Sequence, residues 1–316
     1  MGKPNFRFKT CYRFSIVELY IMTYICHAFW RDFFLYSMIN FNGAIVSEEA
    51  NVLVQNRGFL YGDAVFETVK VVNEKILFLE DHYFRLMSSM RVVRMEIPMN
   101  FTMEYFEEQI LSLVKNNGLA TSSRARITVC RNDGGYYLPQ NNTVSFLIKA
   151  TPLENKEYVF NEQEYEVDLY KDFYVTKQLL SSIKTTNRLI NVTGSIYAHE
   201  NGLNNCILLN DSKNVVEALQ GNIFMLNGNK LITPPVSEGC LNGVMRKQVL
   251  ELAKKIEGIE VCEEIISPFD LQKANELFIT NVIQGIQPIT KYRKKEFSVE
   301  ISKSIVVALN KTFNLI

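Results

Sequence analysis

The sequence predicts a mixed α/β protein with two domains, the second larger than the first. Its 316 residues are enough to form two hydrophobic cores. From Ile39 onward, short runs rich in β-branched and aromatic residues alternate with longer runs of helical periodicity. The polar stretch "TPLENKEY" separates two such sets of elements. We therefore expect a small α/β domain over residues 38–151 and a large domain over residues 158–316.

Composition excludes several classes of partner. The chain is 47% hydrophobic, and 34 Lys and Arg residues balance 34 Asp and Glu residues. This balance argues against a nucleic-acid-binding surface and against an acidic disordered tail. The six cysteines form no CxxC pair, which is typical of reduced thiols in the cytoplasm. The three histidines show no ligand spacing, so no metal site is predicted.

Residues 1–37 differ from the rest of the chain. They are rich in aromatic residues, but Glu18, His27, Arg31 and Asp32 interrupt the apolar runs too often for a membrane span. A signal peptide is an alternative, although Glu18 and the lack of a small-residue cleavage site count against it. We expect the natural chain to start at Met38 and residues 1–37 to be an extension outside the folded protein.

In the first domain, "MINFNGAIV" predicts a strand, a turn and a second strand. "VFETVKVVN" predicts a further strand, and a short strand and an amphipathic helix follow it. In that helix, Phe84, Met87, Met90 and Val93 have helical spacing. "SRARITVCR" and "TVSFLIKATPL" predict two strands around a polar turn.

In the second domain, the pattern predicts two helices and several strands. One helix is expected from about Arg188 to Asn201 and the other over "GVMRKQVLELAKKI". Strands joined by turns are expected over "NCILLND" and "NIFMLNGNKLITPP", and a further strand over "ELFITNVIQGIQPI".

Three features of the second domain suggest chemistry. Lys184 follows a strand-like segment, and partial burial would lower its pKa and make it a nucleophile toward an aldehyde. Glu217 lies at a strand end, where its carboxylate could hold a proton on a pyridine nitrogen. "GCLNGVMRK" runs from a turn into a helix whose free N–H groups could bind a phosphate. Aldehyde, pyridine and phosphate together describe pyridoxal 5′-phosphate.

The motifs also occur in a recognisable order between Met38 and about Tyr292. They are "NRGFLYGDAVFETVKV", "LEDHYFRL", "IKTTNRL", "VVEALQGNIF", "LNGVMRK" and "ELFITNVIQGIQPI". This order resembles the class IV, fold type IV family of pyridoxal-phosphate enzymes. The family contains branched-chain aminotransferases, D-amino-acid aminotransferases and aminodeoxychorismate lyases. The resemblance implies a large domain built as a pseudo-barrel, and a homodimer in which each active site borrows a loop from the partner.

The resemblance also implies roles for particular residues. Lys184 would carry the cofactor covalently and move the substrate proton, and Glu217 would hold the ring nitrogen. Arg85 and the backbone amides of Val244 and Met245 would hold the phosphate, and Leu241 would pack on the ring. Asp63 and Glu67 are expected to be structural.

The reaction is less certain from sequence than the family. Where many transaminases of the family have a tyrosine and a phosphate-binding threonine, this chain has Leu189 and Val282, so Asn281 is expected to serve the phosphate. These departures, together with Arg188, resemble the lyase branch.

A substrate carboxylate needs a cation, and the arginine that the lyase pattern has after the glycine pair is Tyr136 here. Arg126 and Arg131 are the candidates to replace it. We predict an aminotransferase that acts on a branched-chain-like or D-amino acid and a 2-oxo acid. The alternative is a 4-amino-4-deoxychorismate lyase that makes 4-aminobenzoate and pyruvate. A cofactor-free binding protein is disfavoured because Lys184 and Glu217 are both present.

Overall fold

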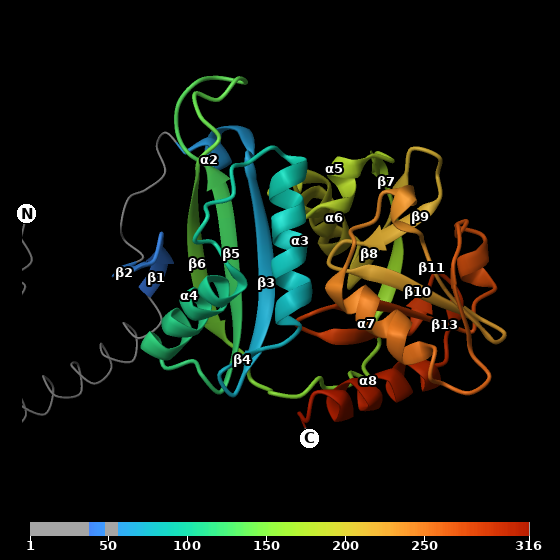
Figure 1. Ribbon diagram of the computed structural model, residues 1–316. Helices are drawn as coiled ribbons and strands as arrows, with labels where there is room; N and C mark the ends of the chain where they lie inside the picture. The colour runs from blue at the N-terminus through green and yellow to red at the C-terminus, as the bar shows by residue number, and fades with distance from the viewer. Residues whose placement is uncertain (1–37, 48–55, 316) are drawn as a thin grey trace, which may run out of the picture.

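A computed structural model describes residues 38–47 and 56–315 of the chain (Figure 1). The extension predicted at residues 1–37 lies outside the described residues. The elements fall into two sets that lie side by side, the first around one sheet and the second around two. The chain leaves the first sheet at Pro152, next to the predicted boundary. The division into domains 38–151 and 158–316 stays a prediction.

The first sheet has six strands in the order β2-β1-β6-β5-β3-β4. All its pairings are antiparallel. Its strands are β1 (Met38–Phe41), β2 (Ala44–Ser47), β3 (Ala64–Val72), β4 (Lys75–Ile76), β5 (Ser122–Arg131) and β6 (Val144–Pro152). The predicted strand–turn–strand at the start is confirmed, and Asn42 and Gly43 form its turn with positive φ. The two strands predicted around the polar turn are confirmed as β5 and β6.

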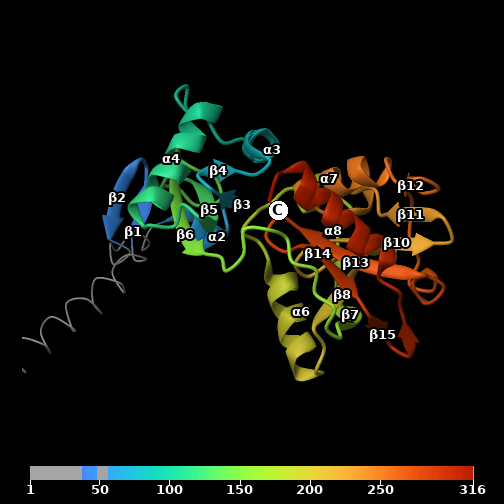
Figure 2. The ribbon, with the colours of Figure 1, turned by 90° about the horizontal axis from the view of Figure 1, so that it is seen from below.

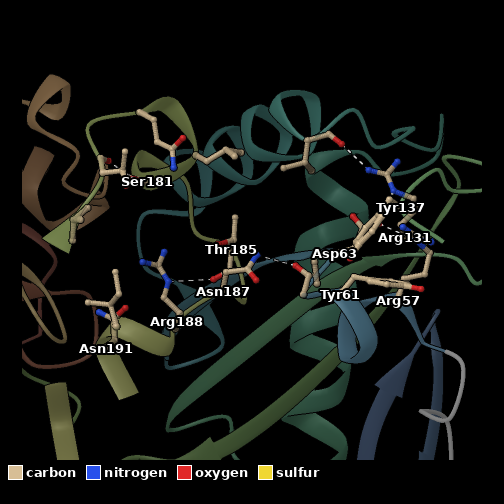
Figure 3. A pocket seen from close by; sticks show the side chains of 18 of the residues that line it. Arg57, Tyr61, Asp63, Arg131, Tyr137, Ser181, Thr185, Asn187, Arg188 and Asn191 are labelled. Carbon is tan, nitrogen blue, oxygen red and sulfur yellow. Dashed lines mark hydrogen bonds and ion pairs between the residues drawn. The ribbon is translucent and has the colours of Figure 1, made fainter. Parts of the chain in front are cut away.

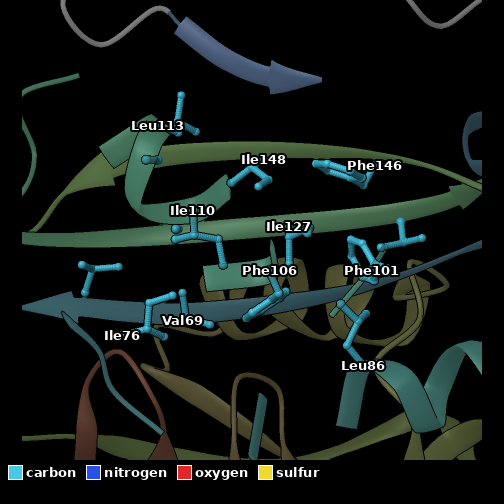
Figure 4. Packing of buried hydrophobic residues seen from close by; sticks show 14 of the residues in the cluster. Val69, Ile76, Leu86, Phe101, Phe106, Ile110, Leu113, Ile127, Phe146 and Ile148 are labelled. Atoms are coloured by element: carbon cyan, nitrogen blue, oxygen red, sulfur yellow. The ribbon is translucent and has the colours of Figure 1, made fainter. Parts of the chain in front are cut away.

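Two helices cover one face of this sheet, α3 (Leu79–Val92) and α4 (Met103–Asn116), while the short α2 (Arg57–Tyr61) precedes β3. Figure 4 shows the core between them, in which Phe106 and Ile110 of α4 meet Val69, Ile127 and Ile148 of the strands.

The face predicted for α3 is partly wrong. Met87 and Met90 are buried as expected, but Phe84 is 61% exposed. The buried stripe runs instead through His82, Leu86 and Met90. Two residues along a helix turn through about 200°, so Phe84 points away from the face on which Leu86 lies.

The second half contains two five-stranded sheets. One has the order β12-β11-β10-β13-β14 and the other β16-β15-β7-β8-β9. The strands of the first are β10 (Asn222–Asn227), β11 (Lys230–Thr233), β12 (Glu260–Glu263), β13 (Glu276–Asn281) and β14 (Gly285–Ile289). Those of the second are β7 (Glu166–Val175), β8 (Asn205–Asn210), β9 (Val215–Ala218), β15 (Lys291–Tyr292) and β16 (Lys295–Glu296). Apolar side chains from both sheets share one core.

Helices cover the outer faces of these sheets. Figure 2 shows α7 (Val244–Ala253) and α8 (Glu300–Thr312) on one flank, with α6 (Leu189–Glu200) apart from them. The former pack on Phe224 and Phe278, and α6 packs on Tyr170 and Leu208. The helices predicted near 188–201 and 243–256 are confirmed. The short helices α5 (Leu179–Ser182), η1 (Val236–Glu238) and η2 (Asp270–Gln272) lie in connections.

The single strand predicted over "ELFITNVIQGIQPI" is wrong, because the structure divides it into β13 and β14. The Asn281 side chain causes the break, since its Oδ1 accepts hydrogen bonds from the backbone of Ile283 at 3.0 Å and Gln284 at 2.9 Å. Such a bond offers the backbone an alternative to the strand ladder. Gly285 then takes a φ of 76° and starts the return strand.

The segment around Lys184 pairs with the first sheet. The Phe66 N–H donates to the Lys184 carbonyl at 2.8 Å, and the Thr186 N–H donates to the Ala64 carbonyl at 3.1 Å. Val65 and Thr185 form the bridge between these bonds. A piece of the second half therefore covers the first part of the free edge of β3, and this fixes the Lys184 backbone at the junction.

In the described part of the chain, no helix has the length and apolar character needed to cross a membrane. The same residues contain no group of His, Cys, Asp and Glu side chains arranged to hold a metal ion.

Candidate active site

A cavity of about 200 Å³ lies at the junction of the two halves. Its wall includes every site residue predicted from the sequence, namely Arg85, Lys184, Glu217, Leu241, Val244, Met245 and Asn281. These residues come from α3, from the segment before α6, from β9, from the turn before α7, from the start of α7 and from β13. The structure thus brings together side chains that are up to 196 positions apart, Arg85 and Asn281.

Lys184 is partly buried at this cavity, with its Nζ 4.7 Å from the centroid of the Phe66 ring. Burial is the main cause that lowers the pKa of Lys184 to about 7, and the Arg85 cation lowers it further. The carboxylates of Glu67 and Glu217 oppose that shift. Near neutral pH a large fraction of this lysine is therefore an uncharged amine, which is the nucleophilic form.

Glu217 is only 6% exposed and lies on β9. Its Oε2 accepts a hydrogen bond from the Leu241 N–H at 2.9 Å, which links the carboxylate to the turn before α7. Burial raises the pKa of Glu217, while Arg188, the Leu241 N–H and Lys184 act to lower it. A buried carboxylate with one backbone partner retains lone pairs that can accept a further donor from the cavity.

The turn into α7 approaches its surroundings closely. Gly243 is the N-cap residue and provides no side-chain cap, so the first N–H groups of the helix, including those of Val244 and Met245, face the cavity end. A Cβ at Gly243 would lie 2.0 Å from the Asn222 Oδ1, so any larger residue here would displace the Asn222 side chain. Nearby, the Thr280 Oγ1 is buried without a hydrogen-bond partner. These unpaired donors fit an anionic group such as a phosphate.

Arg85 is held by a carboxylate that sequence reasoning treated as structural. The Arg85 Nε and Nη2 donate to the two oxygens of Glu67 at 2.7 and 2.6 Å, and Nη1 donates to the Asn242 carbonyl at 2.9 Å. Two of the five guanidinium N–H groups then remain for the cavity. Glu67 is 0% exposed and also contacts the His82 Nδ1 at 2.8 Å. Burial alone would raise the pKa of Glu67, but Arg85 and His82 lower it to about 2.

The role of Glu67 had a signal in the sequence. It is the one acidic residue in the run "AVFETVKVV", where every position of β3 is buried. A carboxylate in a fully buried strand requires a cationic partner. The pattern therefore indicated a buried ion pair, but not that the partner would be Arg85.

Asn281 lines the cavity, but its side chain is engaged in the turn that follows it. Its Oδ1 accepts the two backbone bonds described above, and its Nδ2 donates to the Gln284 Oε1 at 2.8 Å. Its expected contact with a phosphate stays a prediction. Leu189, which occupies the position of the missing tyrosine, is 78% exposed and lines neither this cavity nor the next one.

A second cavity of about 590 Å³ adjoins the first (Figure 3). Arg188, Asn191 and Glu217 line both cavities. At its far side, the Asp63 Oδ2 accepts from the Arg57 Nε at 3.0 Å and from the Arg131 Nε at 2.9 Å.

The remaining donors of these two arginines hold backbone carbonyls. Arg57 donates to the carbonyls of Gly134, Gly135 and Tyr136, and Arg131 donates to those of Val93 and Arg94. Arg131 also bonds the Asn142 side chain. Arg131 is thus committed to the protein, so of the two candidates for a substrate carboxylate it is the weaker.

Arg126 is placed differently. Its guanidinium carbon lies 3.7 Å from the centroid of the same Phe66 ring that Lys184 contacts. Its Nε donates to the Thr128 Oγ1 at 3.3 Å, and in the described residues it forms no ion pair with a carboxylate. Burial lowers the pKa of Arg126, and the neighbouring cations Arg124 and Arg188 lower it further. Arg126 is a cation with capacity for an anionic partner.

An amine nucleophile, a facing buried carboxylate and unpaired phosphate-type donors define an enzyme site built for carbonyl and amino chemistry. Comparison with known proteins agrees. The model of the class IV aminotransferase family matches residues 64–292, which is most of the chain. The chain therefore belongs to the class IV aminotransferase family.

Relatives of known sequence are consistent with this assignment. The chain is 32% identical over 252 residues to a putative branched-chain-amino-acid aminotransferase of Methanocaldococcus jannaschii, covering 79% of this chain and 86% of that one. It is 27% identical over 256 residues to a D-alanine aminotransferase of Listeria monocytogenes, covering 79% and 85%.

The fold matches that of the branched-chain amino acid aminotransferase of Thermobaculum terrenum, solved in its PLP-form. The TM-score is 0.72 at 23% identity, over 86% of this chain and 94% of that one. The predicted family, fold type IV and aminotransferase class are confirmed, and the comparisons do not favour the lyase alternative.

Proposed function

We propose that the protein is a pyridoxal-phosphate-dependent aminotransferase that carries its cofactor on Lys184. The observation that carries the proposal is that Lys184 and Glu217 line one cavity, with unpaired N–H and hydroxyl donors at its end. When bound, pyridoxal phosphate supplies an aldehyde for the lysine and a ring that stabilises negative charge formed at the substrate Cα. The Thermobaculum terrenum enzyme, solved in its PLP-form, supports the same cofactor.

The residues of this chain divide the work. With its pKa near 7, the Lys184 Nζ can attack an aldehyde as a free amine and can then carry a proton from the substrate Cα. The Glu217 carboxylate would hold a proton at the ring nitrogen. Arg85 and the N–H groups of Val244 and Met245 would hold the phosphate, with Asn281 beside them, and Leu241 would pack on the ring.

For the substrates, we propose an amino acid and a 2-oxo acid. The relatives named as branched-chain and D-alanine aminotransferases support a branched-chain-like donor or, second, a D-amino acid. Arg126 supports a second carboxylate on one partner, as in glutamate and 2-oxoglutarate, because a guanidinium free of protein carboxylates pairs well with a substrate carboxylate.

We also propose a homodimer. Apolar side chains are exposed on α2, on the loop 132–140, on α5 and on α6. Tyr137 is 92% exposed, and its ring lies 5.9 Å from that of Tyr61 across the mouth of the second cavity. We call Phe59, Tyr61, Tyr137, Leu138, Leu179 and Leu189 the apolar rim. Large apolar side chains left exposed on several elements favour an interaction site. The four cysteines of the described chain are free thiols, which supports a reducing cytoplasm.

The test is a set of turnover assays with a matched variant. The purified protein is incubated with L-leucine, L-valine or D-alanine and 2-oxoglutarate, and the amino products are identified by mass spectrometry. We expect glutamate to form with at least one donor, and Lys184→Ala to form none. Borohydride reduction of the wild-type protein should place a cofactor adduct on Lys184. An active Lys184→Ala protein, or release of 4-aminobenzoate from aminodeoxychorismate in place of amino transfer, would overturn the proposal.

A further inference from the structure

Arg188 lies between the two cavities and holds the backbone on both sides of Lys184. Its Nε donates to the Thr185 carbonyl and its Nη2 to the Ile183 carbonyl, each at 3.1 Å. These carbonyls belong to the residues directly before and after Lys184 in the chain. One guanidinium thus clamps the lysine's own peptide segment. Figure 3 shows Arg188 beside Thr185. Because two of its nitrogens are used this way, the Nη1 group remains free to face the cavities.

Its position breaks a rule of local structure. Arg188 is the N-cap residue of α6 and makes no side-chain cap bond. Asn, Asp, Ser and Thr are preferred there, because their side chains accept from the first free N–H groups. A cation at a helix N-terminus is also repelled by the helix dipole. Within the described residues, Arg188 has no carboxylate within ion-pair distance. Local rules fail most often at functional sites, where something else is gained.

The charges around Lys184 indicate what is gained. The charged groups that act on Lys184 are Arg85 and Arg188, which disfavour its charged form, and Glu67 and Glu217, which favour it. Arg85 is ion-paired with Glu67 at 2.6 Å, so much of its effect is cancelled. Arg188 is the cation left to balance Glu217, whose charge in turn acts on Arg188.

We propose that Arg188 is a positioning residue for Lys184, which it braces through the two flanking carbonyls. Its cation, placed beside the amine, adds to the effect of burial in disfavouring the ammonium form of Lys184. The inference rests on the proposed function only in assigning Lys184 a catalytic role. The contacts of Arg188 with the two flanking carbonyls do not depend on it. It also explains why an arginine, and not a capping residue, occupies the N-cap of α6.

The test uses the full-length chain freed of cofactor and measures the amine directly. Lys184 is reductively methylated with formaldehyde and a mild borane at a series of pH values, and labelling is quantified by peptide mass spectrometry. Lys213, exposed after β8, is the internal reference. Arg188→Gln removes the charge, and Arg188→Lys keeps the charge but loses the planar two-pronged contact. Arg91→Gln, on the exposed face of α3, is the control.

We expect Arg188→Gln to raise the pH midpoint of Lys184 labelling by about one unit, because loss of a nearby cation favours the ammonium form. Arg188→Lys and Arg91→Gln should keep the wild-type midpoint. Even so, Arg188→Lys should bind pyridoxal 5′-phosphate on Lys184 about three- to tenfold more slowly than the wild type, because the segment around Lys184 is no longer clamped.

A third variant separates positioning from stability. Arg188→Asn supplies a preferred N-cap, so its melting temperature should equal or exceed that of the wild type although its labelling midpoint rises as in Arg188→Gln. An unchanged midpoint in both neutral variants would overturn the inference. So would a large drop in melting temperature for all three variants with no change in midpoint, which would make Arg188 a structural residue. Neither result depends on turnover, so failure of the proposed function is detected separately, by Lys184→Ala.

Discussion

At the scale of single residues, the site places a titratable amine and a titratable carboxylate at one cavity. Lys184 and Glu217 each modify the pKa of the other, and burial pushes both toward their neutral forms. The cofactor proposed between them would depend on both, but for different reasons: Lys184 for attachment and proton transfer, Glu217 for the charge on the ring nitrogen.

Glu217→Gln should retain the cofactor and lose turnover. The amide cannot hold the ring proton, and loss of one charged hydrogen bond at a desolvated site costs roughly 2–4 kcal/mol, or about 30- to 1,000-fold in kcat. Steady-state kinetics and the visible absorbance of the protein measure the two effects. Glu257→Gln, an exposed position after α7, is the matched control. Unchanged kcat in Glu217→Gln would show that this carboxylate does not serve the ring.

Lys184→Met should stabilise the cofactor-free protein while it abolishes activity. The pKa of Lys184 falls from 10.5 to about 7 on folding, so above pH 7 the unfolded chain binds more protons than the folded one. The free energy of unfolding of the wild type should then rise with pH between about 7 and 10, as this cost is relieved. Removing the amine should add roughly 1–3 kcal/mol at pH 7 and flatten that rise. Urea titrations at several pH values measure the free energy of unfolding of both proteins. If it changed with pH equally in the wild type and in Lys184→Met, the expectation would be contradicted.

At the scale of elements, the turn between β13 and β14 depends on Tyr158. The Tyr158 hydroxyl donates to the Val282 carbonyl at 3.0 Å, and its backbone and the Asn310 side chain exchange two bonds of 2.8 Å. The Lys70 Nζ lies 4.3 Å from the centroid of its ring. One buried tyrosine therefore connects the first sheet, α8 and the turn that lines the first cavity.

Gly285→Ala tests this connection. At Gly285 the φ is 76°, and an added Cβ would lie 2.7 Å from the Tyr158 Cδ1. Gly228→Ala is a matched control, because its φ is 61° but nothing lies within 4 Å of an added Cβ. The control should lower the free energy of unfolding by about 1 kcal/mol, because alanine is strained at a left-handed position. Gly285→Ala should lower it by about 2–4 kcal/mol, because it also clashes with Tyr158. Denaturant unfolding measures both, and equal losses would show that Tyr158 can yield freely.

The elements also show how far sequence reasoning reaches. The helices near Lys184 and Val244 were predictable because their apolar periodicity is local. The break at Asn281 was not, because it depends on a side chain that bonds its own backbone within a continuous apolar run. At the site, motif order pointed to seven of the residues that line the first cavity. The pairing of Glu67 with Arg85 required β3 and α3 to meet, and no spacing in the sequence encodes that.

At the scale of the whole molecule, Tyr61 and Tyr137 of the apolar rim line the second cavity, which shares Arg188 and Glu217 with the first. If a second copy covers this rim, the dimer should be a condition of activity. A monomer would leave large aromatic and leucine side chains in water at a substantial cost in free energy.

We expect light scattering to report a dimer that survives dilution into the nanomolar range. Tyr137→Glu, together with Leu138→Glu, places charges in the rim and should shift the protein toward monomer with loss of turnover. Met99→Glu, at a nearly fully exposed position outside the rim, is the control and should leave both properties unchanged. An active wild-type monomer would rule out this assembly.

The bridge between β3 and the segment around Lys184 has a consequence for biogenesis. On one side, β3 pairs with β5 along its whole length, but on the other β4 covers only Val71 and Val72. Until residues 184–186 have been synthesised and docked, the edge of β3 at Ala64–Phe66 stays open. Open strand edges can pair with strands of other molecules. The peptide that carries the nucleophile is thus also the cap against self-association of the nascent chain. Substitutions that weaken its docking should therefore reduce the soluble yield before they affect any measured rate.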